Sequence, residues 1–138
     1  MTIFVIRDKS TPMRHTVRVG DHVITVDSPA ADGGEGAGLS PHDLYDAALG
    51  ACKALTVLYF ANRHHMQVDD IRVQVDRDDS QERQGTYRLD TQIEITGPLS
   101  EEQRASLLRV AGKCPVHKLM TEVKTEITTA WAKPTESK

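Results

Sequence analysis

The chain has 138 residues, a formal net charge of -3 and a sequence pI near 6.0, which fits one domain with its own hydrophobic core. This charge argues against a general nucleic-acid binder or a binder of anionic membranes. The mean hydropathy is -0.43, and no run approaches the roughly 18 apolar residues that a membrane span needs. The N-terminus lacks the basic region of a secretion signal. We therefore expect one cytoplasmic domain over residues 1–138, with no membrane partner and no nucleic-acid partner.

Three short strands are predicted at the start of the chain. Residues 15–19 and 22–26 alternate between apolar and polar side chains on either side of Gly20-Asp21, which is typical of a tight β-hairpin. An apolar patch at residues 3–7 predicts a further strand. The segment that follows the hairpin, Ser28 to Gly38, is rich in Gly and Ala and predicts a long loop.

The longest helix is predicted to begin after Ser40. Ser40, Pro41 and Asp43 have the pattern of an N-cap, a first-turn proline and the N3 acid of a capping box. The run that follows is apolar on nearly every side until about Asn62, and its many small residues would let another backbone come close. A helix of this kind is expected to be buried on most of its faces.

The second half of the chain predicts strands and short helices. Residues 68–76 and 86–96 alternate, so each strand should bury one face, and the polar link from Arg77 to Gly85 predicts a mobile turn. Runs of strands between helices favour an α+β fold with antiparallel sheets around the long helix. The remaining predicted elements are a helix capped by Ser100 that ends near Gly112, a helix from Pro115 to about Glu122, a strand over residues 125–131, and a disordered tail over residues 132–138.

Cys52 and Cys114 are the only cysteines, too few for a disulfide scaffold. Cys114 lies between the helix end at Gly112 and Pro115, so it should be the N-cap of the next helix. The helix dipole and nearby basic residues there favour a thiolate, whereas a small residue that only fits the junction is an equal alternative. Cys52 lies in mid-helix among small residues, where a core cysteine is the simpler interpretation. The residues alone leave open whether either thiol is reactive.

Other kinds of chemistry have less support. The two cysteines and six histidines show no CxxC or HExxH spacing, so no metal site is expected. The segment Gly33-Gly34-Glu35-Gly36 lacks the Lys and Ser/Thr of a phosphate-binding loop. His42 and Cys52 could form a nucleophilic dyad, but ten residues of helix separate them by about 15 Å, so they cannot touch within one helix. No cofactor is expected.

The segment LSPHDL that begins at Leu39, followed by AALGAC ending at Cys52, resembles the central-helix motif of the OsmC/Ohr family of peroxide reductases. Lys113-Cys114-Pro115-Val116 matches the second family cysteine, and the order of elements is similar over roughly residues 1–132. The resemblance implies an OsmC-like fold in a swapped, intertwined homodimer with two active sites at the subunit interface. It also implies that Cys52 attacks a hydroperoxide as a thiolate and becomes a sulfenic acid, which Cys114 converts to a disulfide. A dithiol reductant, lipoyl-type or thioredoxin-like, would restore the pair.

The resemblance also implies activating residues, and here the chain departs from the pattern. The organic hydroperoxide resistance members use an Arg and a Glu to activate the thiolate. Their Glu falls ten residues before the cysteine, where this chain has His42, and Asp43 is the acid that could replace it. Arg14 and Arg18, from the N-terminal strands, are the candidates for the Arg. Because a peroxidatic cysteine without a nearby cation loses reactivity, we expect a divergent member.

Two other functions stay open. A ligand-binding protein on the same scaffold would use an apolar pocket at the dimer interface, and its cysteines would only pack that pocket. Thiol reactivity in the native state separates this alternative from the peroxidase, because buried packing cysteines react slowly. A redox-sensing regulator is less favoured, since the sequence has no recognisable DNA-binding helix or basic patch.

Overall fold

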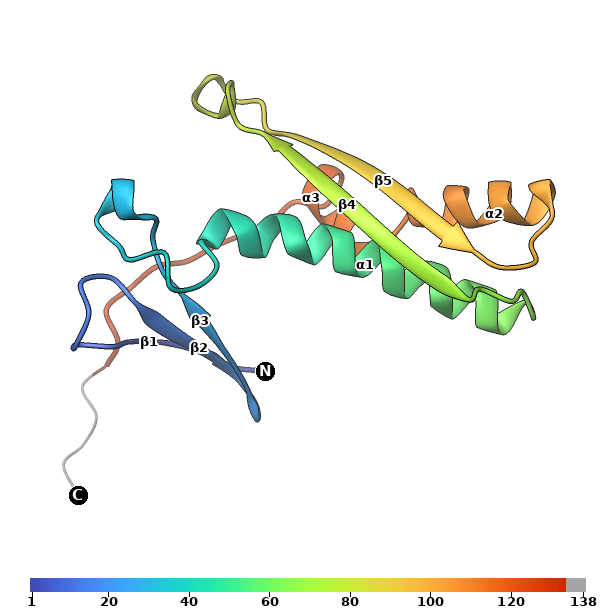
Figure 1. The fold of residues 1–138 in the computed structure, drawn as a ribbon. Coiled ribbons are helices and arrows are strands. Elements are labelled where there is room, and N and C mark those ends of the chain that lie inside the picture. Colours follow the sequence, from blue (N-terminus) through green and yellow to red (C-terminus); the bar gives the residue numbers. More distant parts are fainter. Residues whose placement is uncertain (134–138) are drawn as a thin grey trace.

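The computed structural model describes residues 1–133 and has an α+β fold (Figure 1). An antiparallel sheet in the order β1-β2-β3 comes first, and a separate β4–β5 hairpin lies along the long helix α1. The elements are β1 (Ile3–Arg7), β2 (His15–Val19), β3 (His22–Val26), η1 (Ala30–Asp32), α1 (Pro41–Arg63), β4 (Asp70–Asp78), η2 (Glu82–Gln84), β5 (Arg88–Thr96), α2 (Glu101–Ala111) and α3 (Pro115–Thr121). The three N-terminal strands have the predicted bounds.

Local capping signals set the helix starts as predicted. The Ser40 hydroxyl accepts a hydrogen bond from the backbone N–H of Asp43 at 3.1 Å, and the Asp43 carboxylate accepts one from the Ser40 N–H at 2.9 Å. Ser100 and Gln103 form the same reciprocal pair at the start of α2. These bonds satisfy backbone donors that a helix cannot pair internally, so the sequence fixes both starts.

The core lies where α1 and α2 meet the β4–β5 hairpin. Its fully buried members are Val57 and Ala61 from α1 and Leu107 and Ala111 from α2. Partly buried apolar side chains from the alternating faces of β4 and β5 pack against them. Gly50 lets β4 come close to α1, because a Cβ there would lie 3.0 Å from the Val75 side chain. The core therefore fixes α1 against the hairpin and α2.

The prediction that α1 is buried on most faces is wrong for the single chain. Its buried residues form one stripe, whereas Leu55 is 67% exposed and Tyr59 is also exposed. By its length and mean hydropathy α1 could also cross a membrane, whereas the sequence was expected to contain no membrane span. The core helix of a folded domain meets the same criteria of length and hydropathy. Part of the apolar surface of α1 is thus left uncovered by its own chain.

The predicted last strand over residues 125–131 is also wrong for the single chain. The segment after α3 has no regular structure, and Trp131 is 98% exposed. A strand needs a neighbour for its backbone groups, and none of the described residues supplies one to this segment. Residues 132 and 133 are likewise irregular, and the rest of the predicted tail lies outside the described residues.

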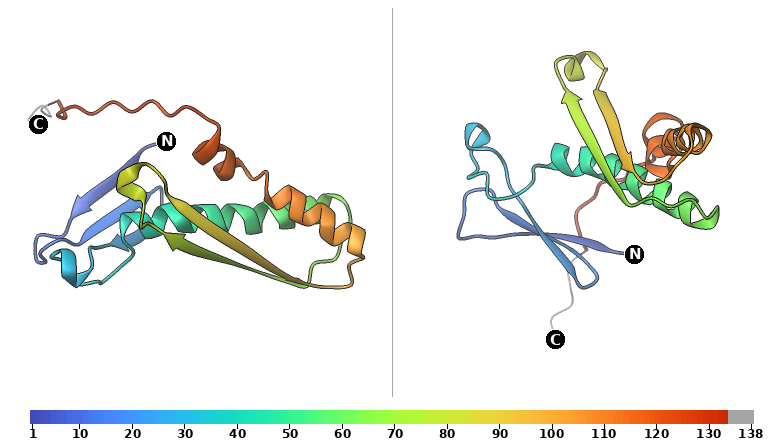
Figure 2. Two further views of the ribbon diagram at one scale, coloured as in Figure 1. Left: turned by 90° about the horizontal axis from the view of Figure 1, so that it is seen from above. Right: turned by 45° about the vertical axis from the view of Figure 1, so that its right-hand side comes forward.

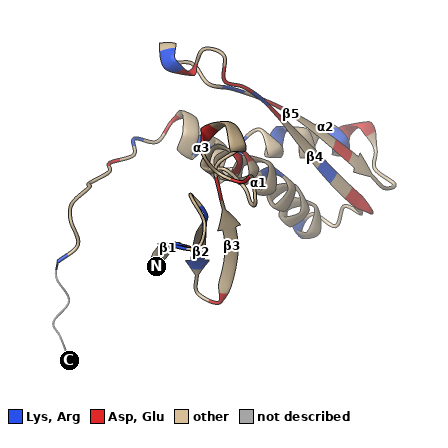
Figure 3. Ribbon diagram, turned by 60° about the vertical axis from the view of Figure 1, so that its left-hand side comes forward, with Lys and Arg blue, Asp and Glu red and all other residues tan. Residues whose placement is uncertain are grey.

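The β4–β5 hairpin extends further into the polar link than predicted. β4 runs from Asp70 to Asp78, two residues later at each end than the predicted strand, and Asp78 pairs with Arg88. Exposed polar residues can continue a ladder, because backbone hydrogen bonds hold it. The loop after Asp78 contains η2 and is held by backbone hydrogen bonds, and its mobility stays a prediction. Acidic and basic residues mix along the hairpin (Figure 3), and Arg72 lies opposite Glu94.

The N-terminal sheet stands apart from the helix–hairpin body (Figure 2). All five residues of β1 are exposed, including Phe4 and Val5. One long connection, residues 27–40, leads from β3 to α1 and is held at Val26 and Leu39 by a parallel bridge. An apolar sheet without a covering layer marks a surface that binds something else.

Candidate active site

The two cysteines, far apart in sequence, lie at one junction of α1 and α3. Cys52 is half-buried on α1, and its Sγ accepts a hydrogen bond from the backbone N–H of Val116, the second residue of α3, at 3.4 Å. Cys114 is 0% exposed and is the N-cap of α3, as predicted. Both are free thiols. One accessible and one fully buried thiol therefore share this junction.

The surroundings of the Cys114 thiol shift its pKa in two opposite directions. Burial raises the pKa of Cys114 most, and interaction with the Cys52 thiol raises it further. The backbone N–H of His117 and the positive charge of Lys53 act in the opposite direction. Burial thus opposes the ionisation that the helix start and the basic neighbours favour, and a reactive thiolate at Cys114 stays a prediction.

Lys53 is a buried basic residue close to the thiols. It is 4% exposed, and its Nζ donates to the backbone carbonyl of Ala111 at 2.9 Å and lies 3.0 Å from His117 Nδ1. No carboxylate pairs with Lys53 among residues 1–133. Lys53 is next to Cys52 in sequence, but adjacent residues on a helix point in different directions. The lysine side chain reaches the segment that carries Cys114.

A second polar cluster lies at the start of α1. The Arg77 guanidinium bridges the carboxylates of Asp43 at 2.7 Å and Asp46 at 2.5 Å, and the Tyr87 hydroxyl donates to Asp46 at 2.6 Å. Burial and the Asp46 carboxylate raise the pKa of Tyr87 to about 12. The cluster borders a groove of about 590 Å³ between α1 and β4. Arg77 was missed as a site candidate because it was assigned to a mobile link.

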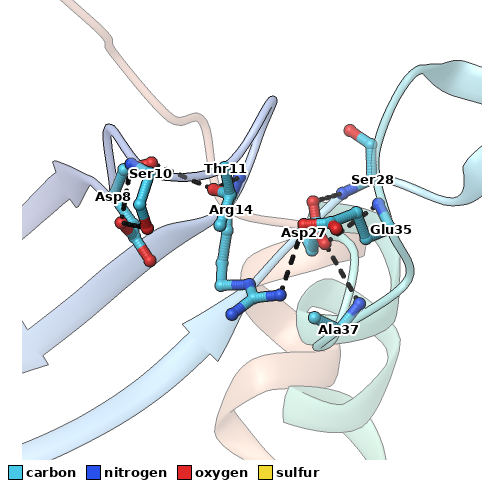
Figure 4. A network of polar contacts seen from close by, with 8 residues as sticks. All are labelled: Asp8, Ser10, Thr11, Arg14, Asp27, Ser28, Glu35 and Ala37. Atoms are coloured by element: carbon cyan, nitrogen blue, oxygen red, sulfur yellow. Dashed lines mark hydrogen bonds and ion pairs between the residues drawn. The ribbon is translucent and has the colours of Figure 1, made fainter.

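The two predicted arginines are not brought to Cys52 within one chain. Arg14 pairs with Glu35 at 3.3 Å, next to a loop that three backbone N–H groups tie to the Asp27 carboxylate (Figure 4). Arg18 lies on β2 between Phe4 and Val23. Neither arginine bonds to Cys52 in the part of the chain that the structure describes. Their role in activation stays a prediction.

The predicted acid and its neighbour bond to groups other than the thiols. His42 Nε2 lies 2.8 Å from the Glu82 carboxylate. Asp43 serves the capping box and Arg77. The N–H of Ser40, and then Arg77, hold the pKa of Asp43 below its ordinary value of 3.8. Asp43 thus has a clear structural role, and a part in catalysis stays a prediction.

Asp43 should make folding stability depend on acid pH. A carboxyl whose pKa is lowered on folding stabilises the chain above its unfolded pKa, and this stability is lost as the pH falls below 3.8 toward the folded value. We expect the urea midpoint of Asp43→Asn to fall less steeply than that of the wild type between about pH 5 and pH 3. Asp90→Asn, at an exposed position on β5, is the control and should keep the wild-type slope. Parallel slopes for Asp43→Asn and wild type would contradict the assignment.

An apolar groove lies on the α3 side of α1. Its volume is about 380 Å³, enough for a small organic molecule. His117 lines it and follows Val116, the residue bonded to Cys52. The other lining residues are Tyr45, Leu49, Tyr87, Leu89, Met120 and Thr121.

Comparison with known proteins identifies the family of this chain. Residues 33–129 match the family described as OsmC-like protein. The chain belongs to the OsmC-like family. No curated protein matches the sequence. The family fold extends over most of the chain: an OsmC-like protein from Mycoplasma pneumoniae has 20% identity and a TM-score of 0.71, covering 88% of this chain and 87% of its own.

Two further OsmC-like structures are named for peroxide resistance. An organic hydroperoxide resistance protein OsmC from Legionella pneumophila has 21% identity and a TM-score of 0.61, covering 88% of this chain and 90% of its own. The organic hydroperoxide resistance protein OhrB of Bacillus subtilis has 23% identity and a TM-score of 0.58, covering 88% and 92%. These likenesses confirm the predicted OsmC-like fold.

Proposed function

We propose that this chain is a thiol-dependent peroxidase that reduces organic hydroperoxides in the cytoplasm. The observation that carries the proposal is the shared junction of Cys52 and Cys114, with the first half-buried and the second fully buried. The apolar groove lined by His117 favours an organic peroxide over hydrogen peroxide. A buried second thiol fits a resolving role, since it is shielded from peroxide in solution.

The proposed chemistry has two steps. The Cys52 thiolate attacks the distal peroxide oxygen, the O–O bond breaks, and the alkoxide takes a proton to leave as the alcohol. Cys52 is oxidised to a sulfenic acid and the peroxide is reduced by two electrons. Cys114 then attacks the Cys52 sulfur, its thiol proton leaves with the sulfenic hydroxyl as water, and a disulfide forms. A lipoyl-type or thioredoxin-like dithiol returns both cysteines to thiols.

The active protein is proposed to be an intertwined homodimer. The uncovered β1 face, the exposed side of α1 and the unpaired segment after α3 are the surfaces that a second copy would cover. A second copy's N-terminal sheet would bring Arg14 or Arg18 toward Cys52. A cation there would favour the thiolate.

Mass spectrometry after one equivalent of an organic hydroperoxide tests the function. We expect the reduced wild type to lose two hydrogens as the disulfide forms. Cys114→Ser should gain one oxygen as a trapped sulfenic acid, and Cys52→Ser should keep its mass. Each variant retains the other cysteine, so the two are matched controls.

An unchanged wild-type mass, while a known peroxidase in the same buffer reacts, would overturn the peroxidase proposal. The apolar groove would then favour a ligand-binding protein. Oxidation of Cys114 in place of Cys52 would reverse the roles of the thiols.

A further inference from the structure

Lys53 takes no part in the two chemical steps above, yet its side chain is almost fully buried close to the two cysteines. We propose that Lys53 is a positioning residue that clamps the turn carrying Cys114 and supplies the positive charge that favours attack by this thiol. The inference rests on the proposed function in that the two cysteines must form a disulfide. It does not depend on which oxidant starts the reaction.

The geometry is that of a clamp. Lys53 Nζ contacts Ala111, three residues before Cys114, and His117, three residues after it. One side chain of α1 thus holds the end of α2 and the first turn of α3 at once. The Val116 N–H contact with Cys52 lies in the same turn. The position of Cys114 relative to Cys52 therefore depends on the lysine.

The position of Lys53 is not that of an ordinary surface lysine. A buried ammonium has to be paired or hydrogen-bonded, and here its partners are a helix-terminal carbonyl and an imidazole nitrogen. The carbonyl end of α2 carries partial negative charge, which suits a cation. Because an ammonium has no acceptor, His117 Nδ1 must accept the hydrogen bond, and its ring proton lies on Nε2.

The positive charge of Lys53 favours ionisation of the Cys114 thiol, which burial disfavours. The groups that face Cys114 are Cys52 and Lys53 from α1 and His117 from α3. Burial and Cys52 raise the pKa of Cys114, whereas the Lys53 charge and the His117 N–H lower it. Lys113 is adjacent to Cys114 in sequence but exposed. The buried lysine is thus the basic side chain of this set that can assist ionisation.

In the step concerned, Cys114 gives up its proton and its sulfur attacks the Cys52 sulfenic acid. The S–O bond breaks, hydroxide leaves and takes a proton to become water, and the S–S bond forms. Lys53 forms and breaks no covalent bond in this step. It favours the thiolate before attack and holds the turn in reach of Cys52.

Disulfide formation by diamide tests the clamp separately from peroxide chemistry. Diamide takes two electrons and two protons from the dithiol. At pH 7 we expect Lys53→Met to form the Cys52–Cys114 disulfide at least about tenfold more slowly than wild type, with its rate–pH profile moved to higher pH. Lys53→Arg should recover part of the rate because it keeps the charge. Lys113→Met removes an exposed lysine next to Cys114 and should stay within about twofold of wild type.

A second variant separates positioning from charge. His117→Leu removes one anchor and leaves the lysine charge, so it should slow the reaction without moving the pH profile. If circular dichroism shows that Lys53→Met does not fold, the His117→Leu variant still tests the clamp. Wild-type rates and profiles for the folded variants would overturn the clamp. If diamide joins the cysteines and hydroperoxide does not, the proposed peroxidase fails and the clamp comparison still stands.

Discussion

Leu55→Glu is expected to weaken association between two copies of this chain by at least about a hundredfold. In one chain Leu55 is 67% exposed, so a glutamate there should do little. In the proposed intertwined dimer the exposed side of α1 is covered, and an unpaired carboxylate would be buried at a cost of several kcal/mol. Because each 1.4 kcal/mol is a factor of ten, a hundredfold is a low bound. Sedimentation velocity over a range of protein concentrations measures the change.

Gln92→Glu is the matched control for this experiment. Gln92 is exposed on β5, outside the surfaces that the second copy is proposed to cover, and the substitution adds the same charge. We expect it to leave the dimer intact. If Leu55→Glu and Gln92→Glu sediment alike, the exposed face of α1 is not the interface. A wild type that sediments as a monomer at every concentration would contradict the intertwined dimer itself.

The sequence predicted best what neighbouring residues decide. The capping boxes at Ser40 and Ser100 and the Gly20-Asp21 hairpin act over two to four residues, and all are observed. The errors concern burial. The apolar face of α1 and the apolar residues of the segment after α3 imply that something covers them, but periodicity cannot tell whether the cover comes from the same chain. The predicted strand at residues 125–131 lacks a partner for the same reason.

The candidate site divides in a similar way. The resemblance identified Cys52 and Cys114, whose motifs are local. Lys53 and Arg77 were missed because their roles depend on distant contacts, from Lys53 to His117 and from Arg77 to Asp46. A lysine inside an apolar helix is the signal that could have found the first, since an uncompensated buried charge is costly. Arg77 lies in an ordinary polar stretch, which gives no such signal.

Leu107→Ala should cost about 3 kcal/mol of the free energy of unfolding. Leu107 is fully buried in the core between α1 and α2, so its truncation removes apolar contacts and leaves a cavity. Urea unfolding at one fixed protein concentration measures the loss, because dimer stability depends on concentration. Leu108→Ala is the matched control, with the same atoms removed from the next residue of the same helix.

The outcome for Leu108 also bears on assembly. Leu108 is 65% exposed in the single chain, and its truncation should change the free energy of unfolding by no more than about 0.5 kcal/mol. Equal losses at both positions would mean that Leu108 is covered in solution and that α2 belongs to an interface. A small loss at Leu107 would contradict the core described above. A large loss for Leu107→Ala and a small one for Leu108→Ala would therefore mean that one chain builds this core by itself. The exposed side of α1 and the N-terminal sheet would then be the surfaces that form the dimer.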